Sequence, residues 1–272
     1  MKITYYGTAA GEAWPGVFCE CELCREAIRR GGKNIRTRSQ ALIDDDLLLD
    51  LPPDMLYHRL QYGLDIGPVR SLLFTHSHND HCYPEDLELL REPYSHTRQP
   101  MAVFGNGAVE QKVLHEAGEG SEHNRFSFTR LAPGDTVETA GYRVLALRAT
   151  HTPKEECLFY RIGKGGKSVL YAHDTGALTE ENLRMLREAG GVLSLVSLDC
   201  TQQLHRDGHY HMGIADAAEQ KELLLREHLA DENTVFVLNH FSHNGGLLHE
   251  EMERHAADCG MLAAYDGLSI EF

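Results

Sequence analysis

The chain has 272 residues, 42 % of them hydrophobic, which is typical of a globular protein that folds as one large domain or two small ones. Its formal net charge of −15 disfavours an extended nucleic-acid-binding surface, because acidic side chains repel a phosphate backbone. The N-terminus has no signal-peptide pattern and no apolar stretch is long enough to span a bilayer, so we expect a cytoplasmic protein without a membrane anchor.

Short apolar runs and helical patterns alternate along the first part of the chain. We expect strands at residues 2–6, 41–44, 47–50, 69–74 and 101–104. We expect helices at residues 22–30, 54–61, 85–91 and 107–116, the first ended by two glycines and the third begun by Pro84.

The second part of the chain begins with β-rich patterns. Strands are expected at residues 126–131, 142–149, 158–162 and 168–172, followed by a helix at 180–188. Residues 193–198, 214–228, 235–238, 248–259 and 268–272 then fit strand, helix, strand, helix and strand. Because no internal repeat, low-complexity tract or composition break interrupts the pattern, we expect one domain over residues 1–272.

A dense group of ligand-type side chains follows the apolar run at residues 69–74. His76, His78, Asp80 and His81 form the pattern H-x-H-x-D-H. Side chains at the end of a buried strand lie on a loop held by a rigid element, where sites in α/β proteins commonly form. Imidazole and carboxylate groups suit zinc, iron and manganese, so the pattern indicates a metal site rather than a solvated surface loop.

Three more such residues follow predicted strands. His151, Asp174 and His240 come after the runs at 142–149, 168–172 and 235–238. Each alone would fit an ordinary polar residue of the surface or core, but together they extend the first group. We interpret the adjacent His173 as a supporting or structural residue.

The seven cysteines are an odd number, and Cys19, Cys21 and Cys24 lie within six residues. In a cytosolic chain this spacing favours metal binding over a disulfide. Three thiolates can chelate zinc, which needs a fourth ligand to complete a tetrahedron. Unrelated buried or surface thiols are the alternative.

The order of H-x-H-x-D-H, His151, Asp174 and His240 resembles the metallo-β-lactamase fold superfamily. The resemblance implies an α/β (α+β) fold, a four-layer αββα sandwich with a two-metal site along one edge. It also implies a hydroxide held between the two ions as the nucleophile. It assigns the first ion to His76, His78 and His151, the second to Asp80, His81 and His240, and a bridging position to Asp174.

The cysteine cluster is similar to that of the phosphoribosyl cyclic phosphodiesterase subgroup of phosphonate breakdown. That resemblance implies a structural zinc held by Cys19, Cys21, Cys24 and His243. Pyrroloquinoline quinone biosynthesis protein B shares a similar cluster, so this feature alone does not choose a substrate.

The loop before the helix at 214–228 contains His205, His209 and His211. A leaving alkoxide needs a proton, and a histidine suits that task. In the phosphodiesterase and transfer-RNA 3′-processing families a histidine just before this helix supports the leaving group. His211 matches that place best, His209 second and His205 third. Asp80 is the other expected catalytic side chain.

We therefore expect a two-metal phosphodiesterase that acts on a small cyclic phosphate or phosphate diester. Its two active-site ions would be zinc or manganese, with iron also compatible, and a homodimer is compatible with its size. A transfer-RNA 3′-endonuclease is an alternative, but we find no Lys/Arg-rich arm, and a lactonase or a non-catalytic cofactor-biosynthesis protein are others. A β-lactamase would carry a signal peptide, and a thioesterase of the glyoxalase II type a C-terminal helical domain.

Overall fold

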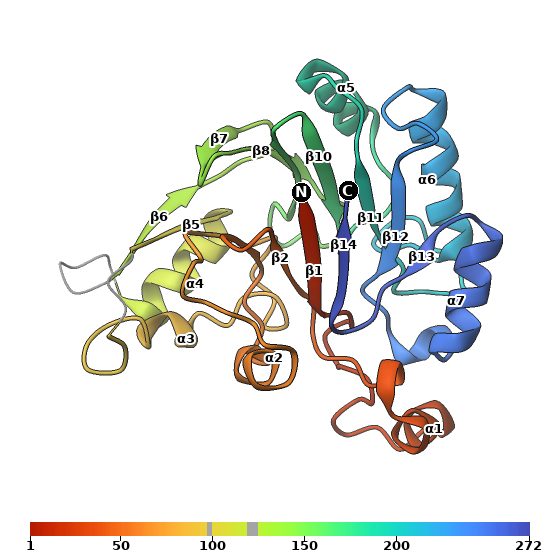
Figure 1. Cartoon of the computed structure of the whole chain (residues 1–272), viewed down its shortest axis with the longest axis horizontal. Helices are drawn as coiled ribbons and strands as arrows, with labels where there is room; N and C mark the ends of the chain where they lie inside the picture. The colour runs from red at the N-terminus through yellow and green to blue at the C-terminus, as the bar shows by residue number, and fades with distance from the viewer. Residues whose placement is uncertain (97–99, 119–124) are drawn as a thin grey trace.

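In the computed structural model of the chain, the described residues form two mixed β-sheets of seven strands each, which lie between two layers of helices (Figure 1). The structure describes residues 1–96, 100–118 and 125–272. The predicted four-layer αββα sandwich is thereby confirmed. That residues 1–272 form a single domain stays a prediction.

The first sheet has the strand order β14-β1-β2-β3-β4-β5-β6. Strands β14, β1, β2 and β3 pair antiparallel, whereas β3 to β6 run parallel. The bounds are β1 Lys2–Gly7, β2 Gln40–Ile43, β3 Leu47–Leu49, β4 Ser71–Leu73, β5 Met101–Gly105, β6 Phe126–Arg130 and β14 Leu268–Glu271.

The second sheet has the strand order β13-β12-β11-β10-β9-β8-β7. Strands β7 to β10 pair antiparallel, whereas β10 to β13 run parallel. The bounds are β7 Thr136–Thr139, β8 Tyr142–Arg148, β9 Leu158–Lys164, β10 Lys167–Ala172, β11 Leu195–Asp199, β12 Val235–Asn239 and β13 Leu262–Ala263.

Helices cover the outer face of each sheet (Figure 1). The first sheet carries α2 (Met55–Tyr62), α3 (Glu85–Glu88) and α4 (Gly107–Ala117), and the second carries α5 (Glu180–Ala189), α6 (Ile214–Arg226) and α7 (His249–Asp258). Helix α1 (Glu22–Arg30) packs at the lower end of the view, and two short 3₁₀ turns span Gly32–Asn34 and His243–Gly245.

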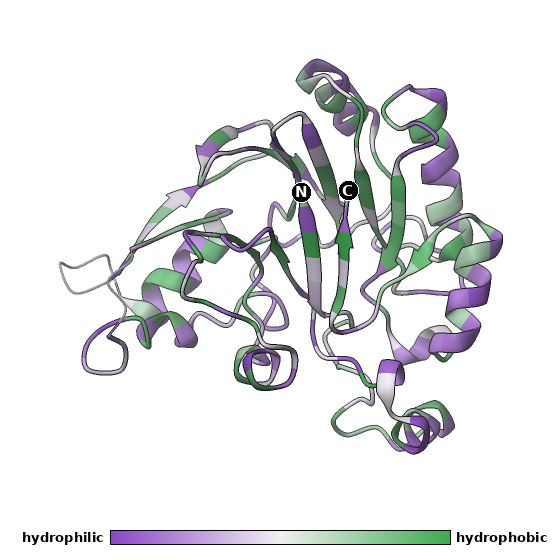
Figure 2. Cartoon of the chain, in the orientation of Figure 1, coloured by the Kyte–Doolittle hydropathy of each residue, from purple (hydrophilic) through white to green (hydrophobic). Residues whose placement is uncertain are grey.

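Alternating side chains of the first sheet enter two different cores. Ile43 and Leu73 face the second sheet, whereas their neighbours Leu42 and Leu72 face the helices. Because both faces are covered, these strands are apolar on both sides, as Figure 2 shows for much of the strand layer. Each fully buried aliphatic side chain contributes about 1.5–3 kcal/mol relative to an exposed one. These two cores fix the strand ends from which the site is built.

The sequence-based elements differ from the structure mainly in length. Strand β4 covers only Ser71–Leu73 of the predicted run 69–74, and α3 ends at Glu88 rather than at 91. Strands β7 and β13 were not predicted. Strand β7 is an exposed edge without an apolar pattern, and β13 has only two residues, so neither carries a recognisable period.

Candidate metal centre

Ligand-type residues gather where the strands of both sheets end. The H-x-H-x-D-H loop follows β4, and His151 and Asp174 follow β8 and β10. His240 directly follows β12. Parallel neighbours place their carboxyl ends at one edge of a sheet, so residues far apart in sequence meet there.

Three residues at this edge hold strained backbone conformations. Asp50, Asp174 and His240 have φ values of 61°, 49° and 64°, in the left-handed region that side chains with a Cβ rarely adopt. Such conformations cost about 1–3 kcal/mol each and cluster at functional sites. The packing of the surrounding sheet therefore offsets this strain and keeps the three side chains directed at one region.

The first group consists of His76, His78 and His151. Their ligand-type nitrogens all lie within 4.8 Å of one another, and His151 Nε2 is 3.1 Å from His78 Nδ1. His76 is fully buried, yet its Nε2 has no hydrogen-bond partner among the described residues. Burying an imidazole nitrogen without a partner is costly, so His76 Nε2 fits the role of a metal-binding atom.

The second group consists of Asp80, His81, Asp174 and His240. Oδ2 of Asp174 lies 2.7 Å from His81 Nε2, 3.3 Å from His240 Nε2 and 3.4 Å from His76 Nε2. His81 Nε2 lies 3.3 Å from Asp80 Oδ2 and 3.2 Å from His240 Nε2. Asp174 thus lies between the two groups, where the resemblance to the superfamily places a bridging carboxylate.

Hydrogen bonds around the groups leave the converging nitrogens as acceptors. Nδ1 of His81 donates to Asp50 at 2.7 Å, so its Nε2 keeps a lone pair. Nδ1 of His240 lies 2.8 Å from the hydroxyl of Thr201, which itself donates to Asp199. The lone pairs of these two Nε2 atoms converge with the Asp174 carboxylate, and a cation bound between them would accept all of these donors.

The spacings fit divalent ions. Two ligand atoms about 2.0–2.1 Å from one tetrahedral ion lie about 3.3 Å apart. The distances from Asp174 to His240 and from His81 to Asp80 are both 3.3 Å. The two groups therefore have the donor types and spacings of a two-ion site, and the identity of the metal is left open by these donors.

The electrostatics of the site favour the ligand forms of two of its histidines and of both carboxylates. Burial lowers the pKa of His76 well below its ordinary value and also lowers the pKa of His151, so both stay neutral. Burial would raise the pKa of Asp80 and Asp174, but neighbouring histidines outweigh it and lower both. Burial opposes a charge on His81, yet Asp80, Asp50 and Asp174 raise its pKa well above the ordinary value. The carboxylates thus favour a positive charge here, which a bound cation would supply.

Sequence reasoning missed the residues that orient these ligands. Asp50 is fully buried and also accepts hydrogen bonds from the backbone N–H and hydroxyl of Thr75. Asp199 is fully buried and accepts from the backbone N–H of Asp174 at 3.0 Å. Both stand at or just after the ends of apolar strands, β3 and β11, which is the same signal that indicated Asp174.

The histidine-rich loop brings one of its three histidines to the site. Nδ1 of His211 lies 3.2 Å from Asp199 Oδ2 and 3.3 Å from Asp174 Oδ1. Its ring also packs against that of His151, with centroids 4.9 Å apart. His209 and His205 are exposed, and the His209 ring packs on Tyr210 instead. Within the described residues, neither joins the groups of ligand-type side chains, so the geometry favours His211 over the second and third candidates.

His173 lies apart from the ligand groups, as the sequence suggests. Its Nε2 is 2.7 Å from the hydroxyl of Ser197, which accepts a hydrogen bond from Tyr5 across the sandwich. Its ring packs on Tyr171, with centroids 3.9 Å apart. These contacts place it in the core behind His240.

A separate group joins Cys19, Cys21, Cys24 and His243. His243 Nδ1 lies 3.6 Å from Cys21 Sγ and 3.9 Å from Cys19 Sγ. A tetrahedral zinc with ordinary zinc–sulfur and zinc–nitrogen bonds would separate such atoms by about 3.6 Å. The fourth residue is the one that the resemblance to the phosphodiesterase subgroup implies, and the donor types and spacings of the set fit a structural zinc.

This cysteine group connects the N-terminal loop to the loop that carries His240. The backbone N–H of Ala10 donates to Phe241, and the hydroxyl of Ser242 donates to Glu12 at 2.5 Å. The backbone N–H of Cys24 donates to Cys21 Sγ and lowers the pKa of Cys21 to about 6. A thiolate at this position is the form that binds metal.

Comparisons with known proteins identify the family to which the chain belongs. Residues 47–237 match the model of the Beta-lactamase superfamily domain, which covers more than half of the chain. No functionally curated protein matches the chain by sequence. In the described parts of the chain, no helix has the length and apolar character needed to cross a membrane.

Solved structures share the whole fold at low sequence identity. A diphosphatase of the PhnP family is 22 % identical with a TM-score of 0.77, over 100 % of this chain and 97 % of that one. Zinc-bound PqqB from Methylobacterium extorquens is 19 % identical with a TM-score of 0.76, over 100 % of both chains. The short form of human tRNase Z is 16 % identical with a TM-score of 0.66, over 100 % of this chain and 99 % of that one. With the family match and the His/Asp groups at its sheet edge, the chain belongs to the beta-lactamase superfamily and has the fold and site of a metal-dependent hydrolase.

Proposed function

We propose that this protein hydrolyses a small cyclic phosphate or phosphate diester with two divalent ions. The observation that carries the proposal is the position of His211, which Asp199 holds 3.3 Å from Asp174 and beside both ligand groups. A site that only bound metal would not need a proton donor at this place.

Each ligand group would hold one of the two ions. His76, His78 and His151 would hold one ion, and Asp80, His81 and His240 the other, with Asp174 contacting both. When bound, two such ions lower the pKa of water and neutralise charge on phosphate oxygens. Asp50 and Thr201 keep His81 and His240 in the tautomers that expose Nε2 to the site.

His211 has the protonation state that a general acid needs. Burial alone would lower its pKa, but the Asp199 carboxylate outweighs burial and the pKa rises to about 9. The imidazolium is therefore present at neutral pH, although bound cations would lower its pKa. Since Nδ1 faces the two carboxylates, Nε2 is left to donate a proton to the leaving alkoxide.

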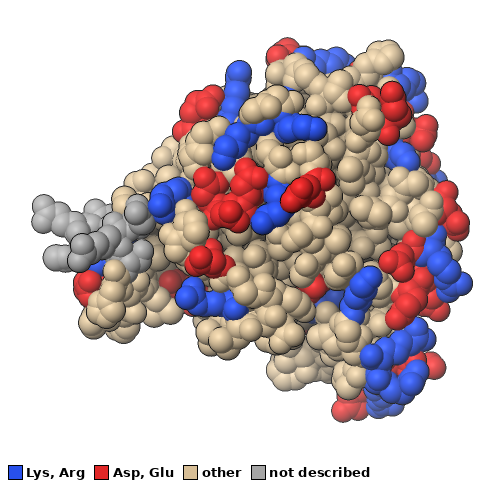
Figure 3. Space-filling model, in the orientation of Figure 1, with Lys and Arg blue, Asp and Glu red and all other residues tan. Residues whose placement is uncertain are grey.

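The surroundings favour a small substrate. A cavity of about 430 Å³ lies between the cysteine group and the metal centre, lined by Cys19, His243, Phe18 and Arg38, and by Gly11, on which a Cβ would lie 3.2 Å from the Asp80 carboxylate. Phe18 is 99 % exposed and offers a flat apolar surface to a substrate's sugar or base. On the face in Figure 3, acidic and basic side chains of the described residues are interspersed, without the broad basic surface that a polynucleotide would require.

A panel of substrates tests the proposal. Purified protein with its metals quantified would be assayed on bis-para-nitrophenyl phosphate, ribose 1,2-cyclic phosphate, 2′,3′-cyclic nucleotides, a precursor transfer RNA and a lactone. We expect turnover of at least one small diester. Turnover of the precursor RNA or the lactone alone would contradict the proposal, and bound ions without any hydrolysis would favour a binding role in cofactor biosynthesis.

His211→Ala tests the proton donor. It should slow diesters with poor leaving groups about 10²–10⁴-fold, and nitrophenyl esters much less, because nitrophenolate leaves without protonation. His205→Ala, an exposed histidine of the same loop, is the matched control and should change neither rate. Equal slowing of both substrate classes by His211→Ala would remove His211 as general acid.

A further inference from the structure

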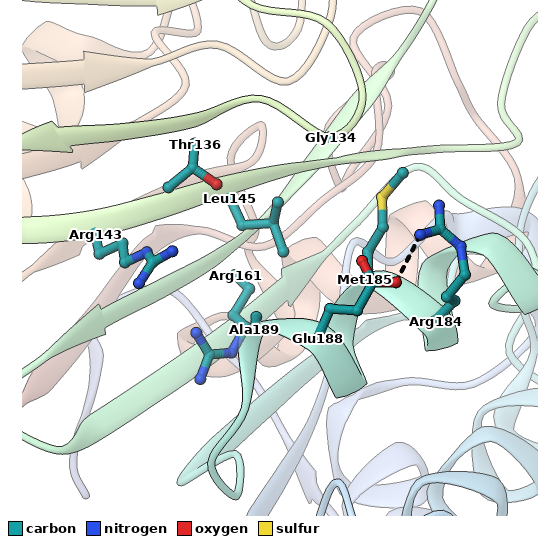
Figure 4. Close-up of a pocket in the computed structure, with 9 residues that line it drawn as sticks. All are labelled: Gly134, Thr136, Arg143, Leu145, Arg161, Arg184, Met185, Glu188 and Ala189. Atoms are coloured by element: carbon teal, nitrogen blue, oxygen red, sulfur yellow. Dashed lines mark hydrogen bonds and ion pairs between the residues drawn. The ribbon is translucent and has the colours of Figure 1, made fainter.

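A second pocket lies on the outer face of the second sheet, between strands β7 to β9 and helix α5 (Figure 4). Its volume is about 310 Å³, within the range of small-molecule sites. Leu145, Met185 and Ala189 provide apolar surface, and Thr136 adds a hydroxyl. This pocket plays no part in the metal centre.

Two arginines of this pocket lie close together on one face of the sheet. Arg143 pairs with Gly163 and Arg161 with Leu145, so the two arginines are diagonal neighbours on β8 and β9. Like charges at this spacing repel, and the proximity of Arg143, after burial, lowers the pKa of Arg161. Arg161 donates to the carbonyl of Gly190 at 2.6 Å. Arg143 lies opposite Glu138 in the register of β7 and β8, but no hydrogen bond or ion pair joins its guanidinium to a described side chain.

The third arginine of the pocket comes from the helix. Arg184 lies 2.8 Å from Glu188 one turn along α5, and Figure 4 shows this pair beside Met185. Three arginines and Glu188 line the pocket, and Glu138 lies opposite Arg143 on the same face of the sheet, so the local net charge is 3 − 2 = +1. A chain with a net charge of −15 thus concentrates positive charge in one small cavity.

We propose that this pocket binds a small molecule that carries a dianionic phosphate group. A guanidinium fork matches phosphate oxygens, and Arg143 offers such a fork, with the remaining N–H donors of Arg161 beside it. The ligand's carbon skeleton would rest on Leu145 and Met185, and Thr136 would donate to a phosphate or hydroxyl oxygen. The pocket's limited volume and the acidic remainder of the chain favour a phosphorylated metabolite over a nucleic-acid backbone.

The pocket is distinct from the catalytic centre but shares its scaffold. Arg143 lies near the start of β8 and His151 follows its end, so about 17 Å of strand and a short loop separate them. Helix α5, which forms the other wall, starts five residues after Asp174 at its N-cap Thr179. Binding at the pocket is therefore measurable without any assumption about the reaction.

Calorimetric titration of the metal-loaded protein with glycerol 3-phosphate and with inorganic phosphate tests the proposal. Arg143→Gln should weaken the pocket's affinity about tenfold or more, because one charge-assisted fork is lost. Arg148→Gln is the matched control, since Arg148 is exposed on the same strand but pairs with Glu156 outside the pocket. Any phosphate bound at the metal centre should be equal in all variants.

Glu188→Gln provides a test in the opposite direction. Removing the one negative charge of the lining and freeing Arg184 should tighten glycerol 3-phosphate binding several-fold. Equal binding by wild type, Arg143→Gln and Glu188→Gln would overturn the proposal. Binding of a single-stranded RNA oligomer, lost in Arg143→Gln, without binding of either small phosphate would also overturn it.

Discussion

Replacing Asp199 by asparagine tests how the protein holds a proton on its candidate general acid. Asp199 is fully buried and accepts hydrogen bonds from the ring of His211 and from the backbone N–H of Met212. Asparagine keeps the volume and can still accept one hydrogen bond, but it removes the negative charge. The pKa of His211 should then fall from about 9 toward the ordinary 6.5.

The size of the effect follows from that difference. Lowering the pKa all the way from 9 to 6.5 would correspond to about 3 kcal/mol of lost stabilisation of the imidazolium, which is an upper limit because Asp174 and Asp207 also raise this pKa. At pH 8 the protonated fraction would drop from roughly nine-tenths to no less than about 3 %, so a diester with an alkoxide leaving group should be hydrolysed up to about thirtyfold more slowly. The direction of the shift follows from the protonation of His211. Its acid form exists below its pKa, so when the pKa falls the alkaline limb of the pH–rate profile should move to lower pH.

The assay compares pH–rate profiles for an alkyl diester and a nitrophenyl diester. Only the alkyl diester should show the displaced limb, since nitrophenolate needs no proton. Asp207→Asn is the graded control, because Asp207 is exposed, contacts the backbone N–H of His211 and raises the pKa of His211 less than Asp199 does, so it should move the limb by less. An unshifted profile with both substrates slowed equally, at normal metal content, would show that Asp199 serves only the structure.

Other substitutions probe the remaining parts of the site. Cys24→Ser should remove one zinc equivalent per chain and lower Tm by roughly 10 °C, measured by metal analysis and calorimetry, whereas Cys259→Ser should do neither. Asp50→Asn should weaken metal affinity about 10–100-fold in a chelator competition, and unchanged affinity would contradict its orienting role. The buried His249 accepts from the Arg36 guanidinium, and burial followed by Arg36 lowers its pKa to about 4. The lowered pKa of His249 therefore contributes about 3 kcal/mol to the free energy of unfolding above pH 6.5, and this contribution is lost as the pH falls toward 4. In urea unfolding, the free energy of unfolding of His249→Gln should fall less steeply between these two pH values than that of the wild type.

The ligand groups could be predicted because their residue types stand out at the ends of apolar runs. His and Asp side chains at the end of a buried strand rarely serve the core alone. The order of these residues along the chain also resembles that of one superfamily. His243 is different. Its pairing with Cys19, Cys21 and Cys24 joins residues more than 200 positions apart, and only the resemblance indicated it.

The orienting residues were not predictable from pattern alone. Asp50 and Asp199 also follow apolar runs, but a single aspartate after a strand is common in turns and caps. Their roles depend on which side chain lies opposite, His81 for Asp50 and His211 for Asp199, and that depends on the packing of loops from different strands. The edge strand β7 was missed for a related reason, since its exposed residues carry no apolar period.

Anomalous diffraction from crystals of the purified protein, collected at metal absorption edges, tests the central claim most directly. The account predicts one ion among His76, His78 and His151, a second among Asp80, His81 and His240 with Asp174 between them, and a third at Cys19, Cys21, Cys24 and His243. Anomalous density at the cysteines alone, in protein that hydrolyses a diester, would contradict it.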